Sequence, residues 1–323
     1  MDLELLHERA RIIRQVRSFF DKRDYLETDT PLLAPNLIPE SCLEVFETYY
    51  LPPAGSKYQK KPYWLIPSPE IWMKRLLARH RTSIYQICKC FRNSESSGRQ
   101  HNPEFTMLEY YTVGADYIDS LKITEELFGE LSASIRAEQL APPFIRLTVE
   151  EAFRRWAGFD LYKAASEPGT LEAEASRLGL NPAPGLSVQE LYDLIFIHTV
   201  ESELDMERPV ALLDYPAFVP CLARKNPDNK TVQRWELYCR NAELANCFTE
   251  ETNADEVRSF IEGEKAKKEK DATVRHVVDD DYWKIFTGDG NKNWSGVAMG
   301  LDRLIMLLCG RSNIDAILPF TME

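Results

Sequence analysis

The sequence has no long apolar run and no leader-like N-terminus. No stretch approaches the roughly 18 apolar residues that a membrane-spanning helix needs, so no membrane contact is expected. The first residues, Met-Asp-Leu-Glu-Leu-Leu-His-Glu-Arg, carry acidic side chains too early for a secretory signal peptide. Both absences indicate a cytoplasmic protein.

Cysteine pairs, histidine clusters and repeats are also missing. The seven cysteines include no Cys-x-x-Cys, and the five histidines do not gather beside them. This usage predicts reduced, mostly buried thiols and argues against a zinc site. The chain contains no internal repeat and no low-complexity tract.

Basic charge is scarce, with 39 Lys and Arg against 51 Asp and Glu and a net charge of −12. A general nucleic-acid-binding protein would show a basic footprint, so the balance argues against one, although a local basic site stays possible. The lysines of residues 265–270 alternate with acids, which predicts a solvated helix face.

What is present suits a globular protein of 323 residues, long enough for one large domain or two medium ones. Apolar spacing predicts helices over 5–20, 119–138 and 253–270. Residues 144–205 carry the capping-box patterns Thr148…Glu151 and Ser187…Glu190, and predict a helical insertion without chemistry.

Residues 91–111 predict two strands joined by a polar loop. Alternation places Glu109 beside Tyr111 on one buried face, and a carboxylate out of water needs a cation or donors. The loop carries Arg92, Arg99 and His101, which could grip a polyphosphate. From these residues alone, an ordinary hairpin with a solvated charged loop is an equal alternative.

Residues 233–246 predict a second hairpin, with Arg240-Asn241 as a two-residue turn. Tyr238 then faces Glu243, and Glu236 lies diagonally to Glu243 on the same face. A divalent cation such as Mg²⁺, arriving with phosphate, would relieve their repulsion. Two exposed glutamates in separate ion pairs are the alternative.

Two helix starts carry further candidate residues. Ser68-Pro69-Glu70 places an N-cap serine, a proline at the first helical position and a carboxylate favoured by the helix dipole. The stretch Ser295-Gly-Val-Ala-Met-Gly-Leu-Asp-Arg303 predicts a strand entering an apolar helix that Gly310 stops. Arg303, at the start of this buried helix, needs an anion.

These stretches together resemble class II aminoacyl-tRNA synthetases of the lysyl type. Phe-Arg-Asn…His-Asn-Pro-Glu-Phe-Thr-Met resembles motif 2, Gly-Leu-Asp-Arg resembles motif 3, and the first helix with Tyr-Leu-Glu-Thr-Asp-Thr-Pro resembles motif 1. The resemblance implies an α+β fold with a central mixed and antiparallel sheet flanked by helices. It implies one catalytic domain over 1–323 that includes the insertion at 144–205, and a homodimer through motif 1.

The chain shows no anticodon-binding domain before motif 1, which favours resemblance to the elongation factor P–(R)-β-lysine ligase family (EpmA/PoxA/GenX). That family implies an ATP-dependent, AMP-forming ligase. It activates (R)-β-lysine or lysine as an adenylate and transfers it to a lysine of elongation factor P. Ala298, where lysyl-tRNA synthetases usually have glycine, favours this family, because one methyl could suit a β-amino group.

Two alternatives stay open. A truncated lysyl-tRNA synthetase could act on tRNA or make signalling dinucleotides, but the acidic balance makes a tRNA partner less favoured. A non-catalytic paralogue could act as a regulatory subunit, but it would have no need of Arg92, Glu236, Glu243 and Arg303.

The resemblance also implies residue roles. Arg92 would hold the α-phosphate and Arg303 the γ-phosphate, and Glu236 and Glu243 would hold Mg²⁺. Further ATP contacts would come from Asn93, Ser94, Glu95, Glu243, Leu244 and Gly300. Substrate contacts would come from Ser68, Pro69, Glu70, Asn102, Glu109, Tyr111, Asn246, Phe248, Glu250 and Ala298.

Two local features complicate this transfer of roles. The family has its adenine-reading glutamate directly after Arg-Asn, whereas here Ser94 intervenes, so the loop is expected to be one residue longer and the shifted Glu95 to take that role. Simple alternation would put Glu243 on the opposite face from Asn246, so a bulge is expected near Ala245.

Overall fold

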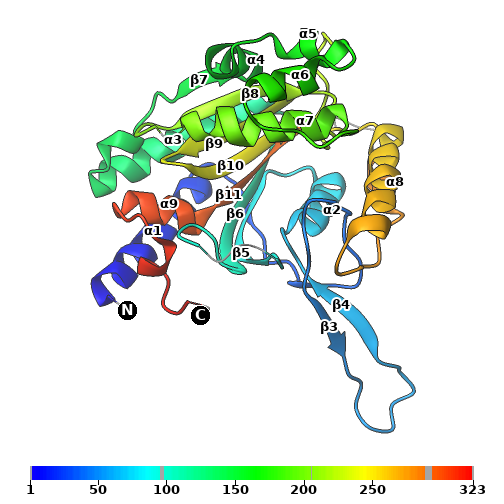
Figure 1. The fold of residues 1–323 in the computed structure, drawn as a ribbon. Coiled ribbons are helices and arrows are strands. Elements are labelled where there is room, and N and C mark those ends of the chain that lie inside the picture. The colour runs from blue at the N-terminus through cyan, green and yellow to red at the C-terminus, as the bar shows by residue number, and fades with distance from the viewer. Residues whose placement is uncertain (1, 95–97, 205, 288–292, 322–323) are drawn as a thin grey trace. The chain divides into compact units, whose positions relative to one another are not determined.

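The computed structural model describes residues 2–94, 98–204, 206–287 and 293–321 (Figure 1). The chain forms two compact units, Met1–Ala115 with Glu251–Glu323, and Asp116–Glu250. Each unit contains a mixed sheet flanked by helices, so the α+β class is confirmed. The single catalytic domain over 1–323 stays a prediction. Among the described residues, no helix is both long and apolar enough to span a bilayer.

The first unit contains four strands that neighbour one another in a mixed sheet, in the order β1 (Leu26–Glu27), β5 (Ile84–Phe91), β6 (Glu104–Val113) and β11 (Trp294–Gly300). β1 runs parallel to β5, and the other pairs are antiparallel. Helix α1 (Leu3–Asp21) buries the predicted apolar stripe, and its Phe20 ring stacks on Tyr85 of β5 at 4.8 Å between centroids.

A three-stranded antiparallel sheet, β2 (Leu33–Ala34), β4 (Lys61–Leu65) and β3 (Glu47–Tyr50), also belongs to this unit. Besides α1, the helices of the first unit are α2 (Glu70–His80), α8 (Ala254–Asp271) and α9 (Leu301–Leu308), with 3-10 turns at Tyr282–Phe286 and Ile314–Ala316. The strand-to-helix prediction at 295–310 is confirmed, since Gly310 with φ +62° follows the end of α9.

Two local predictions in this unit need correction. Helix α2 begins at Glu70 with Pro69 at its N-cap, so Ser68 lies one residue outside; its Oγ still accepts from the Glu70 amide at 3.3 Å. The lysine-rich face of α8 is not simply solvated. Lys268 is 6% exposed and donates to the carbonyl of Leu43, because its long aliphatic stem can be buried while the ammonium finds an acceptor.

The second unit contains a sheet in the order β10 (Ala242–Thr249), β9 (Thr231–Cys239), β8 (Val210–Pro216) and β7 (Ile145–Thr148). Its helices are α3 (Tyr117–Ile135), α4 (Val149–Ala152), α5 (Leu161–Ser166), α6 (Thr170–Arg177) and α7 (Val188–Ile195). Short 3-10 and π segments lie at Glu138–Leu140, Phe153–Ala157, Phe196–Val200 and Glu201–Leu204.

Both predicted capping boxes, Thr148 with Glu151 and Ser187 with Glu190, are present. The helices from α4 to the 3-10 turn at Glu201–Leu204 share one apolar core with β8 and β9, and Figure 1 shows them lying over these strands. The expected insertion at 144–205 opens with a strand, because residues 145–148 pair in parallel with β8 before the helices start.

Candidate active site

Strand β6 carries a buried acidic pair. Glu109 is 2% exposed, and its Oε1 accepts from the Tyr111 hydroxyl at 2.6 Å, as the alternation of the strand predicts. Across the sheet, Glu109 lies opposite Gln86 on β5 and Ala298 on β11. Within the described residues, Glu109 Oε2 is buried without a hydrogen-bond partner. A buried carboxylate oxygen in this state suits a ligand that donates hydrogen bonds.

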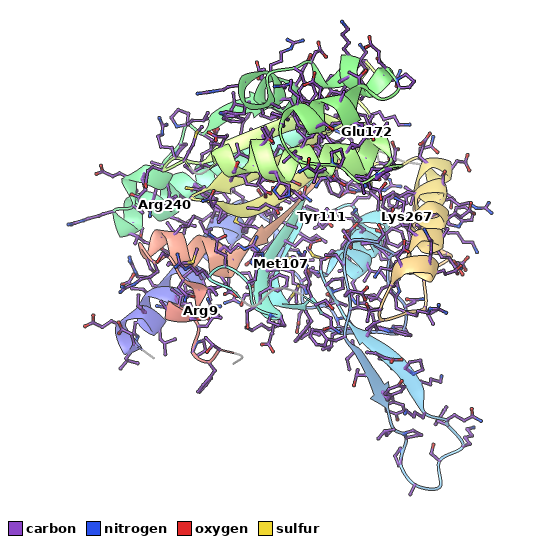
Figure 2. All side chains as sticks on the ribbon, viewed as in Figure 1. Arg9, Met107, Tyr111, Glu172, Arg240 and Lys267 are labelled. Carbon is purple, nitrogen blue, oxygen red and sulfur yellow. The ribbon has the colours of Figure 1, made fainter. Side chains whose placement is uncertain are left out.

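A buried lysine faces this pair. Lys74 is 1% exposed, its Nζ lies 2.6 Å from Glu70 Oε1, and it lies 6.0 Å from the centroid of the Tyr111 ring (labelled in Figure 2). Because Glu70 opens α2, Lys74 sits one turn later on the same face. Sequence reasoning missed Lys74. The i,i+4 spacing from a candidate glutamate was the available signal.

Glu40 is a second residue that sequence reasoning missed. It lines a small pocket with Ser68, Glu70 and other residues of the same unit: Leu37, Ile38, Pro67 and Ile71. Burial, followed by the neighbouring Glu70 carboxylate, raises the pKa of Glu40 to about 7. Residues 35–43 form no helix or regular strand, so no periodic pattern marked Glu40 as a site residue.

The pocket is held in place by α8. Glu264 accepts from the Ser41 amide at 2.7 Å, and Lys268 donates to the Leu43 carbonyl. Lys268 also lowers the pKa of Glu40, though less than burial raises it. The lysine-rich helix therefore has a role in positioning the Glu40 segment.

Three carboxylates gather in this cluster, and three cations act on one of them: Arg92, Lys268 and Lys74 each lower the pKa of Glu40. Glu40, Glu70 and Glu109 are close enough that the Glu70 carboxylate raises the pKa of both others, after the larger effect of burial. Lys74 lowers both pKa values and is paired directly with Glu70. An added ammonium group would stabilise the ionised carboxylates, so the cluster suits a positively charged amine.

Arg92 begins the loop between β5 and β6. Its amide donates to the Pro103 carbonyl at 3.0 Å, and its guanidinium lies 5.2 Å from the centroid of the Phe105 ring. Arg92 Nε is buried without a hydrogen-bond partner among the described residues. A buried guanidinium nitrogen suits a phosphate acceptor. The sequence-predicted anion role for Arg92 therefore fits its surroundings.

The polar residues around Arg92 hold the loop by backbone contacts. Asn93 Nδ2 donates to the Val45 carbonyl at 3.3 Å, and Asn102 Nδ2 donates to the Glu104 carbonyl at 2.5 Å. Ser94 has a positive φ of +58° and its amide donates to Asn93 Oδ1. Glu95, the expected adenine reader, lies outside the described residues.

Arg303 lies in the first turn of α9 and contacts the same loop. Its Nε donates to the Gln100 carbonyl at 3.0 Å. The adjacent Asp302 pairs with Arg9 at 2.6 Å and accepts from the Thr106 amide at 2.6 Å, which ties the helix start to α1 and β6. A Cβ at Gly300 would meet the Arg303 side chain at 3.5 Å. Arg303 is thus tied to the loop by its hydrogen bond to Gln100, and the helix turn that carries it is fixed through Asp302.

In the second unit, the β9–β10 hairpin forms as predicted. Arg240 and Asn241 both have positive φ in the turn, and Glu243 pairs with Tyr238. The expected bulge is confirmed between Glu243 and Ala245, where Leu244 is the extra residue. Because of this bulge, Asn246 pairs with Glu236 and lies on the same face of the sheet as Glu243.

The other candidate site residues on and just after this hairpin, Leu244, Phe248 and Glu250, are at least partly buried. Leu244 and Glu250 are each 1% exposed, and Phe248 packs against the apolar core of the unit. The Glu250 carbonyl accepts from Arg224 at 3.4 Å.

Glu236 is firmly held by neighbours on its own unit. Its Oε1 pairs with Arg234, and its Oε2 accepts from the hydroxyls of Tyr215 and Tyr238, each at 2.5 Å. A carboxylate has about four lone-pair sites, so Glu236 keeps one for a further ligand. No cluster of three or more metal-ligating side chains occurs among the described residues. The Glu236–Glu243 pair therefore fits a metal only with oxygens from elsewhere, as Mg²⁺ with phosphate provides.

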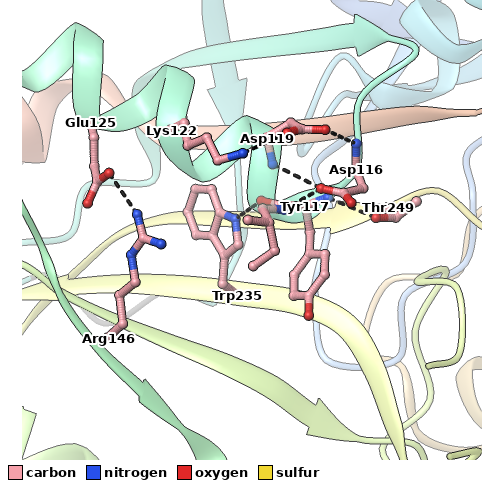
Figure 3. Close-up of polar contacts among 9 residues, drawn as sticks. Asp116, Tyr117, Asp119, Lys122, Glu125, Arg146, Trp235 and Thr249 are labelled. Atoms are coloured by element: carbon pink, nitrogen blue, oxygen red, sulfur yellow. Dashed lines mark hydrogen bonds and ion pairs between the residues drawn. The ribbon is translucent and has the colours of Figure 1, made fainter. Parts of the chain in front are cut away.

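A polar network at the start of α3 holds the strands beside these glutamates (Figure 3). Trp235 Nε1 donates to the Tyr117 carbonyl at 2.6 Å, and the Tyr117 amide donates to Thr249 Oγ1 at 2.9 Å. Asp116 caps the helix from its side chain. Trp235 precedes Glu236 and Thr249 precedes Glu250, so the network fixes the backbone next to Glu236 and Glu250.

Comparison with known proteins supports the motif assignments. Residues 3–323 match the family of class II tRNA synthetases (D, K and N). Three curated relatives are named elongation factor P–(R)-β-lysine ligase. The one from Avibacterium paragallinarum is 34% identical over 99% of this chain and 96% of its own length. Those from Vibrio atlanticus (35%) and Pasteurella multocida (33%) cover 98% and 99% of this chain, and 95% and 96% of their own. The chain belongs to the class II tRNA synthetase family.

Proposed function

We propose that the chain is an ATP-dependent, AMP-forming ligase that activates (R)-β-lysine and transfers it to a lysine side chain of elongation factor P. The acidic cluster of Glu40, Glu70 and Glu109 around one buried lysine is the observation that carries this proposal. A substrate with two ammonium groups would stabilise the ionised forms of Glu40 and Glu109, whose pKa values burial and Glu70 raise, and could donate to the buried Glu109 Oε2. The names of the curated relatives support the same substrate and acceptor.

The reaction has two steps. A carboxylate oxygen of the amino acid attacks the α-phosphorus of ATP, forming an acyl-adenylate and releasing pyrophosphate. The deprotonated amine of the acceptor lysine then attacks the acyl carbonyl, loses a proton and expels AMP. Positioning and charge stabilisation contribute most of the catalysis, because the first step requires little proton transfer.

Each residue has a role within its own unit. Arg92 binds the α-phosphate and Arg303 the γ-phosphate. Glu70 takes the amine near the carboxyl end, and Tyr111 with Glu109 orients the distal amine. Glu236 and Glu243 would hold Mg²⁺, which would neutralise phosphate charge. The motif 1 resemblance adds a homodimer through α1, which sedimentation would test.

Two assays test this function directly. Pyrophosphate exchange with (R)-β-lysine, α-lysine and no amino acid measures activation, and exchange is expected with the β-amino acid above all. Labelled amino acid is then offered to elongation factor P and to tRNA. Label in the protein supports the ligase, whereas label in tRNA would favour a tRNA synthetase, and absence of exchange with every amino acid would refute activation.

Ala298 is expected to set the preference between the two lysines. Its methyl lies opposite Glu109 across the β6–β11 pair, where cross-strand Cβ atoms lie about 5 Å apart. Replacing it by glycine should shift the ratio of kcat/KM toward α-lysine by about tenfold, within the range that one methyl group can decide. Ser295→Ala, on the same strand but on the opposite face, serves as a control. An unchanged ratio in Ala298→Gly would remove Ala298 as a specificity residue.

Glu40 should make amine binding depend on pH. Because its pKa is about 7, Glu40 is largely protonated at pH 6 and ionised at pH 8. The KM for the amino acid in exchange should therefore fall by about fivefold across this range, since only the ionised form attracts an ammonium. In Glu40→Gln this dependence should disappear and KM should stay high. A Glu40→Gln profile that keeps the wild-type slope would contradict the assignment.

A further inference from the structure

Strand β5 carries two cysteines whose side chains are in contact. The Sγ atoms of Cys88 and Cys90 lie 3.9 Å apart, within reach of a weak thiol hydrogen bond. The two residues alternate with Lys89 along the strand, so both side chains project from the same face of the sheet. Met107 of β6, labelled in Figure 2, lies opposite Cys88. Neither step of the proposed reaction uses a thiol, so this contact has no role in the mechanism above.

The two thiols lie on the face of the sheet that carries the candidate active site. Gln86, two residues before Cys88, shares their face of β5 and lies opposite Glu109 on β6. Arg92 follows two residues after Cys90. The pair therefore lies along β5 between the position opposite the amine-binding Glu109 and the phosphate-binding Arg92.

The two thiols differ in exposure and in proton affinity. Cys88 is partly exposed, whereas Cys90 is fully buried. The hydrogen bond from the Cys90 thiol, together with a contribution from Gln86, lowers the pKa of Cys88. Burial raises the pKa of Cys90 well above the ordinary thiol value. An accessible thiol that ionises readily, beside a second thiol that stays protonated, is the arrangement of an oxidation-sensitive cysteine and its resolving partner.

The backbone permits a bond between these two sulfurs. At about 3.3–3.4 Å per residue, Cα atoms two residues apart in a strand lie about 6.7 Å apart, near the upper end of the range that disulfides span. In the described part of the chain, β1 pairs with β5 only at Ile84 and Tyr85, so β6 is the one strand beside Cys88 and Cys90. Bringing the sulfurs to about 2.05 Å would therefore bend β5 at an edge that no second strand holds.

We propose that Cys88 and Cys90 are a reversible oxidation site, at which hydrogen peroxide converts the two thiols to a disulfide that inactivates the enzyme. The Cys88 thiolate attacks one peroxide oxygen, the O–O bond breaks and hydroxide leaves, which produces a sulfenic acid. The Cys90 sulfur then attacks the Cys88 sulfur, forms the S–S bond and releases the sulfenic oxygen as water. In total, two thiols lose two hydrogens and one peroxide becomes two waters.

The disulfide would act on the site through the strand that carries it. β5 runs from Cys90 through Phe91 directly to Arg92, so a bend at the pair displaces the Arg92 guanidinium. We expect pyrophosphate exchange to fall by about a hundredfold, which is the cost of a misplacement of about 1 Å in an active site. This loss of exchange rests on the proposed ligase function, whereas formation of the disulfide does not.

The test uses the full chain with the other partly or fully exposed cysteines, Cys42, Cys221 and Cys309, replaced by serine. Hydrogen peroxide is added in small excess, and peptide mapping by mass spectrometry locates each oxidised cysteine before and after treatment with dithiothreitol. A disulfide between Cys88 and Cys90 should form in step with the loss of exchange, and dithiothreitol should reverse both.

Internal controls and two single variants separate the roles of the thiols. The fully buried Cys239 and Cys247 should stay reduced at the same peroxide dose. Cys90→Ser leaves the Cys88 sulfenic acid without a resolving thiol, so dimedone should capture it and no disulfide should form. Cys88→Ser should make exchange resistant to peroxide. Unaltered thermal unfolding of both variants under reductant shows that they fold.

Each other outcome has a defined meaning. Peroxide that inactivates the enzyme without linking Cys88 to Cys90 would overturn the proposal, and so would a disulfide that leaves exchange unchanged. Inactivation that persists in Cys88→Ser would assign the loss to another residue and overturn it as well. A reduced protein without exchange for any amino acid would refute the proposed function, and the peptide map would then decide on the oxidation site by itself.

Discussion

Replacing Arg303 by alanine is expected to reduce pyrophosphate exchange by about a thousandfold, because removal of one preorganised charge-stabilising donor costs two to three orders of magnitude. Arg303 is held by its hydrogen bond to Gln100 and by the neighbouring contacts of Asp302. The loss should appear mainly in kcat, since Arg303 is proposed to stabilise charge that develops on the leaving pyrophosphate.

Two further variants separate charge from geometry at this position. Arg303→Lys keeps the positive charge but loses the planar fork, so it should recover only a small part of the activity. Arg311→Ala removes an exposed arginine just beyond the same helix and should leave exchange unchanged. Full activity in Arg303→Ala, with thermal unfolding unaltered, would refute the γ-phosphate role.

The substitution Lys74→Met is expected to destabilise the protein by about 3 kcal/mol at pH 8, since removing one partner of a buried ion pair leaves the other charge uncompensated. The variant leaves Glu70 without its ion-pair partner and removes one cation that acts on Glu40 and Glu109. Urea unfolding measures the loss, and the KM for the amino acid should rise because Glu70 is no longer held by Lys74.

The loss of stability in Lys74→Met should depend on pH. Burial and Glu70 already raise the pKa of Glu40 and Glu109, and removal of Lys74 raises both pKa values further. The folded variant then holds protons that the unfolded chain releases, so its stability falls as pH rises through and beyond 7. Near pH 5 these acids are protonated in the folded state, and the difference from wild type should be small.

A double-mutant cycle completes this experiment. Glu70→Gln combined with Lys74→Met should cost less than the sum of the two single changes, because neither partner is then left charged alone. Lys122→Met, at an exposed lysine paired with Asp119, is the matched control and should cost less than about 1 kcal/mol. An equal loss at pH 5 and pH 8 in Lys74→Met would contradict the proposed charge balance.

Much of the local structure could be predicted because its causes are local. The buried Glu109 and Tyr111 follow from strand alternation, and the turn at Arg240-Asn241 follows from a two-residue hairpin. The bulge beside Ala245 could be inferred because Glu243, Asn246 and Glu250 had to lie on one face of the strand.

Other features could not be predicted because they depend on contacts between distant parts of the chain. Glu40 lies in a segment without periodicity, and its raised pKa arises from packing against Glu70, thirty positions away in the sequence. Lys268 looked like part of a solvated face, but it is buried against a carbonyl at position 43. Arg234 and two tyrosines hold Glu236, which no spacing rule indicates.

The sequence by itself determined the family and the strands and helices that carry the motifs, and it predicts which residues bind phosphate, metal and amine. These depend on periodicity and on short ordered patterns. The tertiary structure alone decided that Glu40, Glu70 and Glu109 lie close together around the buried Lys74. Charge balance and surface exposure arise only when segments far apart in the chain are folded together, because both depend on distance in space rather than on spacing in sequence.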